Sequence, residues 1–240
     1  MTEQPTRLTT TEFHARVHAL NPRVAVFDCD GTLWSGDAGS TFMHWSIDTN
    51  LISPEQAAWI LTRYDGYKNN TVSEYDICGE MVQVYAGLPV DTLRRAAAEF
   101  FRDYVEPNIF SEMADLIAEL QKNHTDIWAV SSTNDWVIEE GVRRFNIPAH
   151  RVLAARVEVD NKLATDRLIH VPTDEDKVVA LSRVHITAPD VVFGNSIHDA
   201  AMLSITKSKS GAFPVNPSTG LLERAAAEGW PVYFPSSVTP

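Results

Sequence analysis

The chain has 240 residues, of which 44% are apolar, and a formal net charge of -12 at pH 7. A chain of this length can bury a substantial core and suits one α/β domain with an inserted module. Nucleic acid and anionic membranes are not expected partners, because both require clustered Lys and Arg and no basic run is present. No apolar stretch reaches the roughly 20 residues of a membrane span, and the first residues are polar, so we expect a soluble, cytoplasmic protein.

The cysteines and histidines predict no metal site. Cys29 and Cys78 are far apart in the chain, which indicates neither a disulfide framework nor a thiolate metal site. The histidines show no metal-binding spacing, and we expect four of them to be surface or hydrogen-bonded groups rather than ligands: His44, His124, His170 and His185. Nothing in the sequence indicates the oligomeric state.

The first predicted elements are a short amphipathic helix over Thr10–Leu20 and a central strand over Val24–Phe27. No strand is indicated between Gly39 and Pro107, where apolar residues recur at helical spacing. We therefore expect a helical cap over residues 39–107, inserted into a catalytic core formed by residues 1–38 and 108–240. The helical spacing is found in Ser53–Tyr64, Ser73–Tyr85 and Val90–Tyr104.

Strand and helix patterns alternate after the insert, which predicts an α/β fold with a Rossmann-like, doubly wound parallel sheet. The segment Val152–Leu163 is expected to hold a strand or a hairpin. The other expected strands are Asp126–Val130, Val191–Phe193, Gly211–Val215 and Pro231–Phe234, and the expected helices are Ile109–Asn123, Asn134–Phe145, Thr173–Val184, His198–Ser204 and Gly220–Glu228.

The first central strand leads directly into Asp28-Cys29-Asp30-Gly31-Thr32. Two carboxylates two residues apart can converge on one point beyond the strand end. Asp28 is the expected nucleophile toward a phosphate monoester, and a divalent cation would neutralise the charge that both anions carry. Asp30 is placed to protonate the leaving alkoxide and then to deprotonate water. Gly31 permits the turn, whose backbone N–H groups, including that of Thr32, can bind phosphate oxygens.

Polar residues also follow later strands, and the carboxyl ends of parallel strands meet at one edge of a sheet. Ser131 and Ser132 precede a helix N-terminus. The serine hydroxyl groups and the free N–H groups of the helix start together predict an anion-binding surface. Lys177 lies at the start of a later helix. Asn195 and Asp199 follow the next strand, where Asp199 can reach the metal or its waters.

These motifs, in this order, resemble the haloacid dehalogenase superfamily of phosphatases. The branch most similar is the phosphoserine-phosphatase-like one, whose helical cap follows the first motif. The resemblance implies that the Asp28 carboxylate and the Asp30 backbone carbonyl bind Mg²⁺, and that Asp30 is the acid/base. It also implies that Ser131 holds the transferring phosphoryl group and that Lys177 offsets the negative charge. Magnesium fits because hard oxygen ligands predominate.

Asn195 departs from the family pattern, in which Asp usually holds this position as a metal ligand. An amide oxygen can still coordinate, but one negative charge is lost, so we expect weaker Mg²⁺ binding or a ligand role for Asp199. The function predicted is thus a magnesium-dependent phosphomonoesterase with an aspartyl-phosphate intermediate. A phosphotransferase with the same intermediate and a non-catalytic phosphate-binding protein remain alternatives.

The substrate is expected to be a small phosphorylated metabolite. Phosphoserine is disfavoured because Gly79–Leu88, where the family has a carboxylate-binding arginine, contains none. Aromatic and acidic residues, including Trp34, Asp37 and Glu80, would instead receive an amine or a quaternary ammonium group. The other interpretation is that the aromatic residues form the helical core of the cap.

Overall fold

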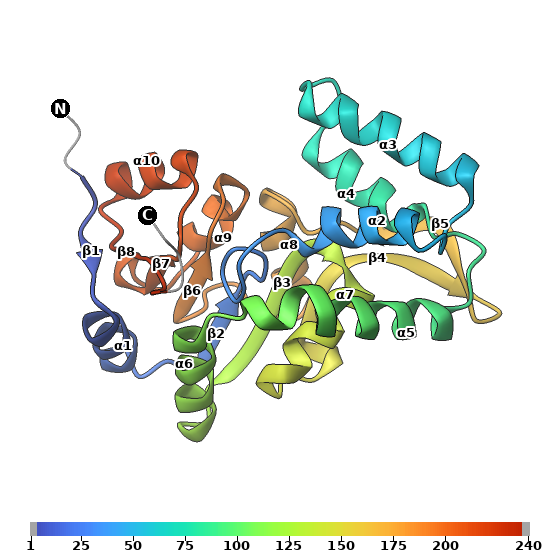
Figure 1. The fold of residues 1–240 in the computed structure, drawn as a ribbon. Helices are drawn as coiled ribbons and strands as arrows, with labels where there is room; N and C mark the ends of the chain where they lie inside the picture. Colours follow the sequence, from blue (N-terminus) through green and yellow to red (C-terminus); the bar gives the residue numbers. More distant parts are fainter. Residues whose placement is uncertain (1–3, 237–240) are drawn as a thin grey trace.

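The protein is described by a computed structural model that covers residues 4–236, and its centre is a six-stranded sheet in the order β5-β4-β3-β2-β6-β7 (Figure 1). Neighbouring strands are parallel except for β5, which runs antiparallel to β4. The strands are β1 (Arg7–Leu8), β2 (Val24–Phe27), β3 (Asp126–Asn134), β4 (Val152–Asp160), β5 (Leu163–His170), β6 (Val191–Gly194), β7 (Ala212–Pro214) and β8 (Val232–Tyr233).

Serine, threonine and asparagine begin several of the helices. Thr9 and Ser53 each form a capping box, and the Asn134 side chain accepts a hydrogen bond from Val137 N at the start of α7. The helices are α1 (Thr10–Ala19), α2 (Ala38–Asp48), α3 (Pro54–Lys68), α4 (Glu74–Gln83), α5 (Val90–Phe100), α6 (Ser111–Lys122), α7 (Asp135–Val142), α8 (Glu175–Arg183), α9 (Ala200–Ser204) and α10 (Thr219–Glu228). A π-helical turn at Phe101–Val105 continues α5.

The predicted α/β class and the central sheet are confirmed, with three differences in detail. Val152–Leu163 does begin a hairpin, but its second strand is β5, because Asn161 and Lys162 both adopt positive φ in a tight two-residue turn. The expected strand at Pro231–Phe234 is β8, which pairs with β1 outside the central sheet. Helix α2 was not among the expected elements.

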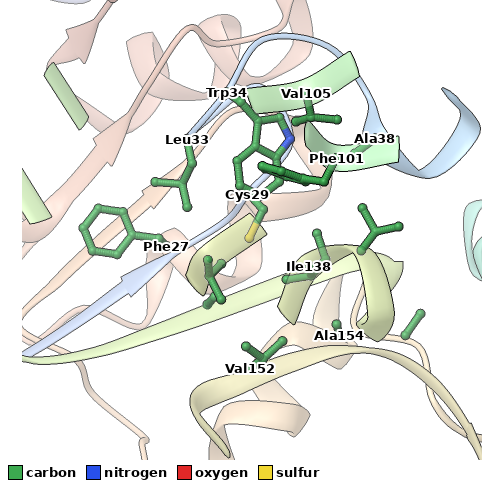
Figure 2. Close-up of a cluster of buried hydrophobic side chains, with 14 of the residues drawn as sticks. Phe27, Cys29, Leu33, Trp34, Ala38, Phe101, Val105, Ile138, Val152 and Ala154 are labelled. Carbon is green, nitrogen blue, oxygen red and sulfur yellow. The ribbon is translucent and has the colours of Figure 1, made fainter. Parts of the chain in front are cut away.

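Both faces of the sheet are covered. Ala25 and Phe27 of β2 belong to one buried cluster, whereas Val26 belongs to a second cluster formed with α8, α9 and α10. This alternation is the period of two of a strand with two buried faces. The larger cluster, part of which Figure 2 shows, also contains buried side chains from α2 to α5, so the inserted helices pack into the same apolar core as the sheet. Division of the chain into cap and core domains stays a prediction.

Candidate active site

A pocket of about 460 Å³ lies where β2, β3 and β6 end. Its lining combines polar residues from these strand ends with residues of the inserted helices. The lining residues are Asp28, Asp30, Gly31, Gly36, Asp37, Tyr64, Tyr67, Glu74, Ile77, Cys78, Met81, Ser131, Ser132, Thr133, Lys177, Asn195, Ser196, His198 and Asn216. The strand ends therefore meet at one edge of the sheet, as the sequence predicted.

Asp28 and Lys177 form a buried ion pair in this pocket. Lys177 Nζ donates to Asp28 Oδ1 at 2.8 Å and to Asp199 Oδ1 at 2.5 Å, and the lysine is only 2% exposed. Burial and the neighbouring charge of Asp199 raise the pKa of Asp28 to about 6, against the opposing effect of Lys177. Burial opposes the charged form of Lys177, but the two carboxylates outweigh it and hold the pKa of the lysine above its usual value.

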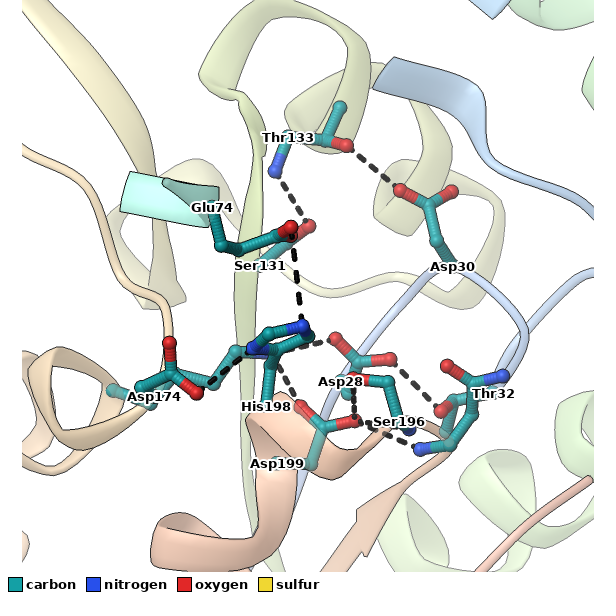
Figure 3. Close-up of polar contacts among 12 residues, drawn as sticks. Asp28, Asp30, Thr32, Glu74, Ser131, Thr133, Asp174, Ser196, His198 and Asp199 are labelled. Atoms are coloured by element: carbon teal, nitrogen blue, oxygen red, sulfur yellow. Dashed lines mark hydrogen bonds and ion pairs between the residues drawn. The ribbon is translucent and has the colours of Figure 1, made fainter. Parts of the chain in front are cut away.

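Asp30 is held by three hydrogen bonds. Its Oδ1 accepts from Trp34 Nε1 at 2.6 Å and from Ala38 N at 2.9 Å. Its Oδ2 accepts from Thr133 Oγ1 at 2.7 Å (Figure 3). Burial, followed by the charge of Asp37, raises the pKa of Asp30 to about 7. A carboxyl group with this pKa can both donate and accept a proton near neutral pH, which is what an acid/base residue requires.

Gly31 is required by the local geometry. Its φ is +73°, and a Cβ added there would lie 2.1 Å from Asn195 Nδ2. The Asn195 side chain thus packs directly on the turn that follows Asp28. Ser131 Oγ also faces the pocket and accepts a hydrogen bond from Thr133 N at 3.1 Å.

The donor atoms of the pocket fit a magnesium ion. Asp28 and Asn195 supply a carboxylate and an amide oxygen to one cavity, and hard oxygen ligands of this kind suit Mg²⁺. Cys78 also lines the pocket, but burial raises the pKa of its thiol well above the usual value. Burial therefore disfavours the thiolate, which is the form that acts as a soft ligand.

The expectation that Asp199 contacts the metal is not supported by its position. The side chain is fully buried and does not line the pocket. Its Oδ1 accepts from Lys177, and its Oδ2 accepts from Asn195 N and Ser196 N at 2.8 and 2.9 Å. Asp199 instead orients Lys177 and the turn that carries Asn195.

Three residues predicted to bind substrate lie outside the pocket. Thr32 is fully buried: its backbone N donates to Cys29 O at 3.1 Å, and its side chain donates to Asp28 Oδ2 at 2.9 Å. Trp34 is fully buried in the core, where it packs edge-on against Phe101. The Glu80 carboxylate forms a two-oxygen contact with Arg63 Nε. In each case the side chain bonds to another part of the protein, which a sequence pattern alone does not reveal. The remaining predicted residues, Asp37 and Ser132 among them, do line the pocket.

Glu74, Tyr64, His198 and Thr133 line the pocket although the sequence did not single them out for this role. Glu74 lies at the first turn of α4, and its Oε2 is buried without a hydrogen-bond partner. That oxygen is 3.8 Å from Nε2 of His198, whose Nδ1 lies 2.8 Å from Asp174 (Figure 3). The position of Glu74 immediately after a capping serine was the only sequence signal, and it indicates a helix start rather than a site.

Sequence comparison finds a match to the family model for haloacid dehalogenase-like hydrolases over residues 25–204. A protein of Mycobacterium tuberculosis named as a probable phosphatase is 28% identical over 157 residues, which are 63% of this chain and 53% of that protein. The chain thus spans about half the length of this relative. A protein of Neisseria meningitidis named histidinol-phosphatase is 23% identical over 87% of this chain and 97% of its own length.

Solved structures share the fold. A protein of unknown function from Bordetella pertussis has a TM-score of 0.76 and 22% identity, and the match covers 88% of this chain and 98% of that one. A phosphoserine phosphatase structure with an analogue of the phospho-aspartyl intermediate has a TM-score of 0.58 and 13% identity, over 90% and 94% of the two chains. None of the helices described for residues 4–236 is both long and apolar enough to cross a membrane.

Proposed function

The chain belongs to the haloacid dehalogenase-like hydrolase family, and we propose that it is a magnesium-dependent phosphomonoesterase that forms an aspartyl-phosphate on Asp28. The observation that supports this most directly is that one pocket contains two carboxylates with different kinds of hydrogen-bond donor. Asp28 accepts a hydrogen bond from Lys177, whereas Asp30 is held by neutral donors and has a pKa of about 7. One carboxylate therefore suits nucleophilic attack and the other suits proton transfer.

In the first half-reaction, Asp28 attacks phosphorus and the bond to the leaving alkoxide breaks, while Asp30 gives its proton to that alkoxide. In the second, Asp30 takes a proton from the water that attacks the phosphorus of the intermediate, and Asp28 is released. Lys177 offsets negative charge on Asp28 and the phosphoryl group, and Ser131 holds a phosphoryl oxygen. When bound by Asp28 and Asn195, Mg²⁺ would supply further positive charge at the phosphoryl group.

The substrate class we propose is a small phosphate monoester that carries a protonated amine. Asp37 and Glu74 line the pocket, and Lys177 is the only Lys or Arg among its described lining residues. Glu74 Oε2 is buried without a hydrogen-bond partner. A cationic group on the substrate would stabilise such a buried carboxylate oxygen. Tyr64 and Tyr67 add aromatic surface beside it. Histidinol phosphate carries such an amine, as does phosphoethanolamine.

The test is hydrolysis of a panel of phosphate esters with and without Mg²⁺. The panel contains histidinol phosphate, phosphoethanolamine, phosphocholine, phosphoserine and an aryl phosphate. Magnesium-dependent phosphate release that disappears in Asp28→Asn supports the phosphatase. Release that requires an added alcohol acceptor would identify a phosphotransferase, and phosphate binding without turnover would identify a binding protein. A clear preference for phosphoserine would contradict the amine-specific substrate class but not the phosphatase.

A further inference from the structure

A second cluster of metal-ligating side chains lies outside the pocket, between α1 and α6. His14 and His18 are four residues apart on α1, and Glu119 lies on α6. One ligand atom from each of the three residues lies within 4.8 Å of the other two. The expectation that the histidines show no metal-binding spacing was therefore wrong for this pair, because residues four apart face the same side of a helix.

The geometry around Glu119 is compact. His14 Nδ1 lies 3.2 Å and His18 Nε2 lies 2.7 Å from the same carboxylate oxygen, Oε2. The corners of a tetrahedral zinc site are about 3.4 Å apart, since zinc-to-nitrogen and zinc-to-oxygen bonds are about 2.0–2.1 Å. The two contacts are shorter than this edge by only about 0.2 and 0.7 Å. The side chains are partly exposed, at 18%, 32% and 44% for His14, His18 and Glu119. An ion can therefore enter from solvent.

The helices that carry the three ligands are firmly placed. Phe13 and Val17, on the neighbouring face of α1, are fully buried in the core, and Leu116 and Leu120 of α6 are buried in the same cluster. The two helices contact each other and lie side by side in Figure 1. Because the backbone of both helices is held by packing, the histidines and the glutamate are brought together before any ion arrives, which lowers the entropy loss on binding.

We propose that His14, His18 and Glu119 form a zinc-binding site that joins α1 to α6. Two imidazoles and one carboxylate are ligands that zinc favours, with water completing the tetrahedron. This donor set differs from the oxygen ligands of the pocket, so Zn²⁺ and Mg²⁺ are expected at different places in one molecule. None of the three residues lines the pocket, and the proposal does not depend on phosphatase activity.

The test is titration of the metal-free full-length protein with Zn²⁺ by calorimetry and with Co²⁺ by visible absorption, in excess MgCl₂ to occupy the pocket. The wild type is expected to bind one equivalent, to show the intense bands of tetrahedral Co²⁺, and to unfold at a higher temperature with Zn²⁺. The variants His18→Ala and Glu119→Gln are expected to bind at least about tenfold more weakly. The exposed His150, in a 3₁₀ turn away from this cluster, supplies the matched control His150→Ala, which is expected to bind as the wild type does.

Three outcomes would overturn the proposal. They are the absence of saturable Zn²⁺ binding in the wild type, Co²⁺ bands that are octahedral and weak, and unchanged affinity in the double variant His14→Ala/His18→Ala. The first two measurements use the wild type, so they remain decisive even where a variant folds poorly. Circular dichroism of each variant shows whether its fold is kept.

Discussion

Trp34 Nε1 donates a 2.6 Å hydrogen bond to Asp30 Oδ1, although the two residues were expected to act separately on the substrate. The indole is fully buried, so it can hold the Asp30 carboxylate in place but is not positioned to contact a ligand. A hydrogen bond to the carboxylate favours its charged form and partly offsets the effect of burial on its pKa. In the proposed mechanism, this relationship makes Trp34 a positioning residue for proton transfer by Asp30.

We expect kcat/KM to fall at alkaline pH. Asp30 must be protonated to donate to the leaving group, so the rate declines as pH rises through its pKa, which is about 7. The measurement is the pH dependence of kcat/KM for an alkyl phosphate at saturating Mg²⁺, in which this decline forms the alkaline limb of the profile. An aryl phosphate, whose leaving group needs little protonation, is expected to show a smaller decline. A decline of the same size for both esters would exclude Asp30 as the group responsible.

Replacing Trp34 by Phe removes the indole donor while keeping an aromatic ring in the core. Loss of a donor to the carboxylate raises the pKa of Asp30, so the alkaline limb is expected to move to higher pH, with kcat about tenfold lower and KM little changed. The control is Trp128→Phe, since Trp128 Nε1 makes a similar bond to Asp126 Oδ2 that is remote from the pocket. Identical pH profiles for Trp34→Phe and wild type would remove the positioning role.

Asn195→Asp is expected to bind Mg²⁺ about tenfold more tightly, because the site gains one negative charge beside Asp28. The measurement is the Mg²⁺ concentration that gives half-maximal phosphate release. Asn161→Asp, in the β4–β5 turn, adds the same charge away from the pocket and is expected to leave this concentration unchanged. No difference between Asn195→Asp and wild type would argue against Asn195 as a ligand.

Glu74→Gln is expected to lower kcat/KM for an amine-bearing substrate by about tenfold or more, mainly through KM, because a neutral amide replaces a buried carboxylate. Hydrolysis of an aryl phosphate without an amine is expected to change little. Glu80→Gln provides a matched control on the same helix, since Glu80 is paired with Arg63 outside the pocket. Equal losses on both substrates would point to a structural role for Glu74.

Gly31→Ala is expected to lower activity strongly and to weaken Mg²⁺ binding, because the new methyl group displaces the Asn195 side chain. Gly229→Ala is the control for backbone strain, since Gly229 has the same φ of +73° but no atom within 4 Å of an added Cβ. Both variants are expected to lose about 1 kcal/mol of unfolding free energy from strain, measured by urea unfolding. Full activity in Gly31→Ala would contradict the close packing of Gly31 on Asn195.

Much of the candidate site was predictable because its residues lie at or next to predicted strands. Asp28 and Asp30 follow β2, Asn195 follows β6, and Ser131 lies in the second half of β3. Parallel strands bring their carboxyl ends together whatever the rest of the fold does. Which acidic residue of the inserted helices lines the pocket was not predictable in this way. Glu74 and Glu80 lie on the same helix, and only the position of Arg63 determines which of them is paired away from the pocket.

The sequence by itself determined most of the strands and helices, the family, and the pair of aspartates that defines the proposed chemistry, because periodicity and short motifs are local properties of the chain. Only the tertiary structure decided that the buried Trp34 donates a hydrogen bond to Asp30 and that Asp199 accepts one from Lys177. It also decided that His14, His18 and Glu119 lie close together. Lys177 and Asp199 are 22 residues apart and Glu119 lies 101 residues from His18, and all three arrangements depend on side-chain packing. Their distances follow from packing, which no spacing in the sequence records.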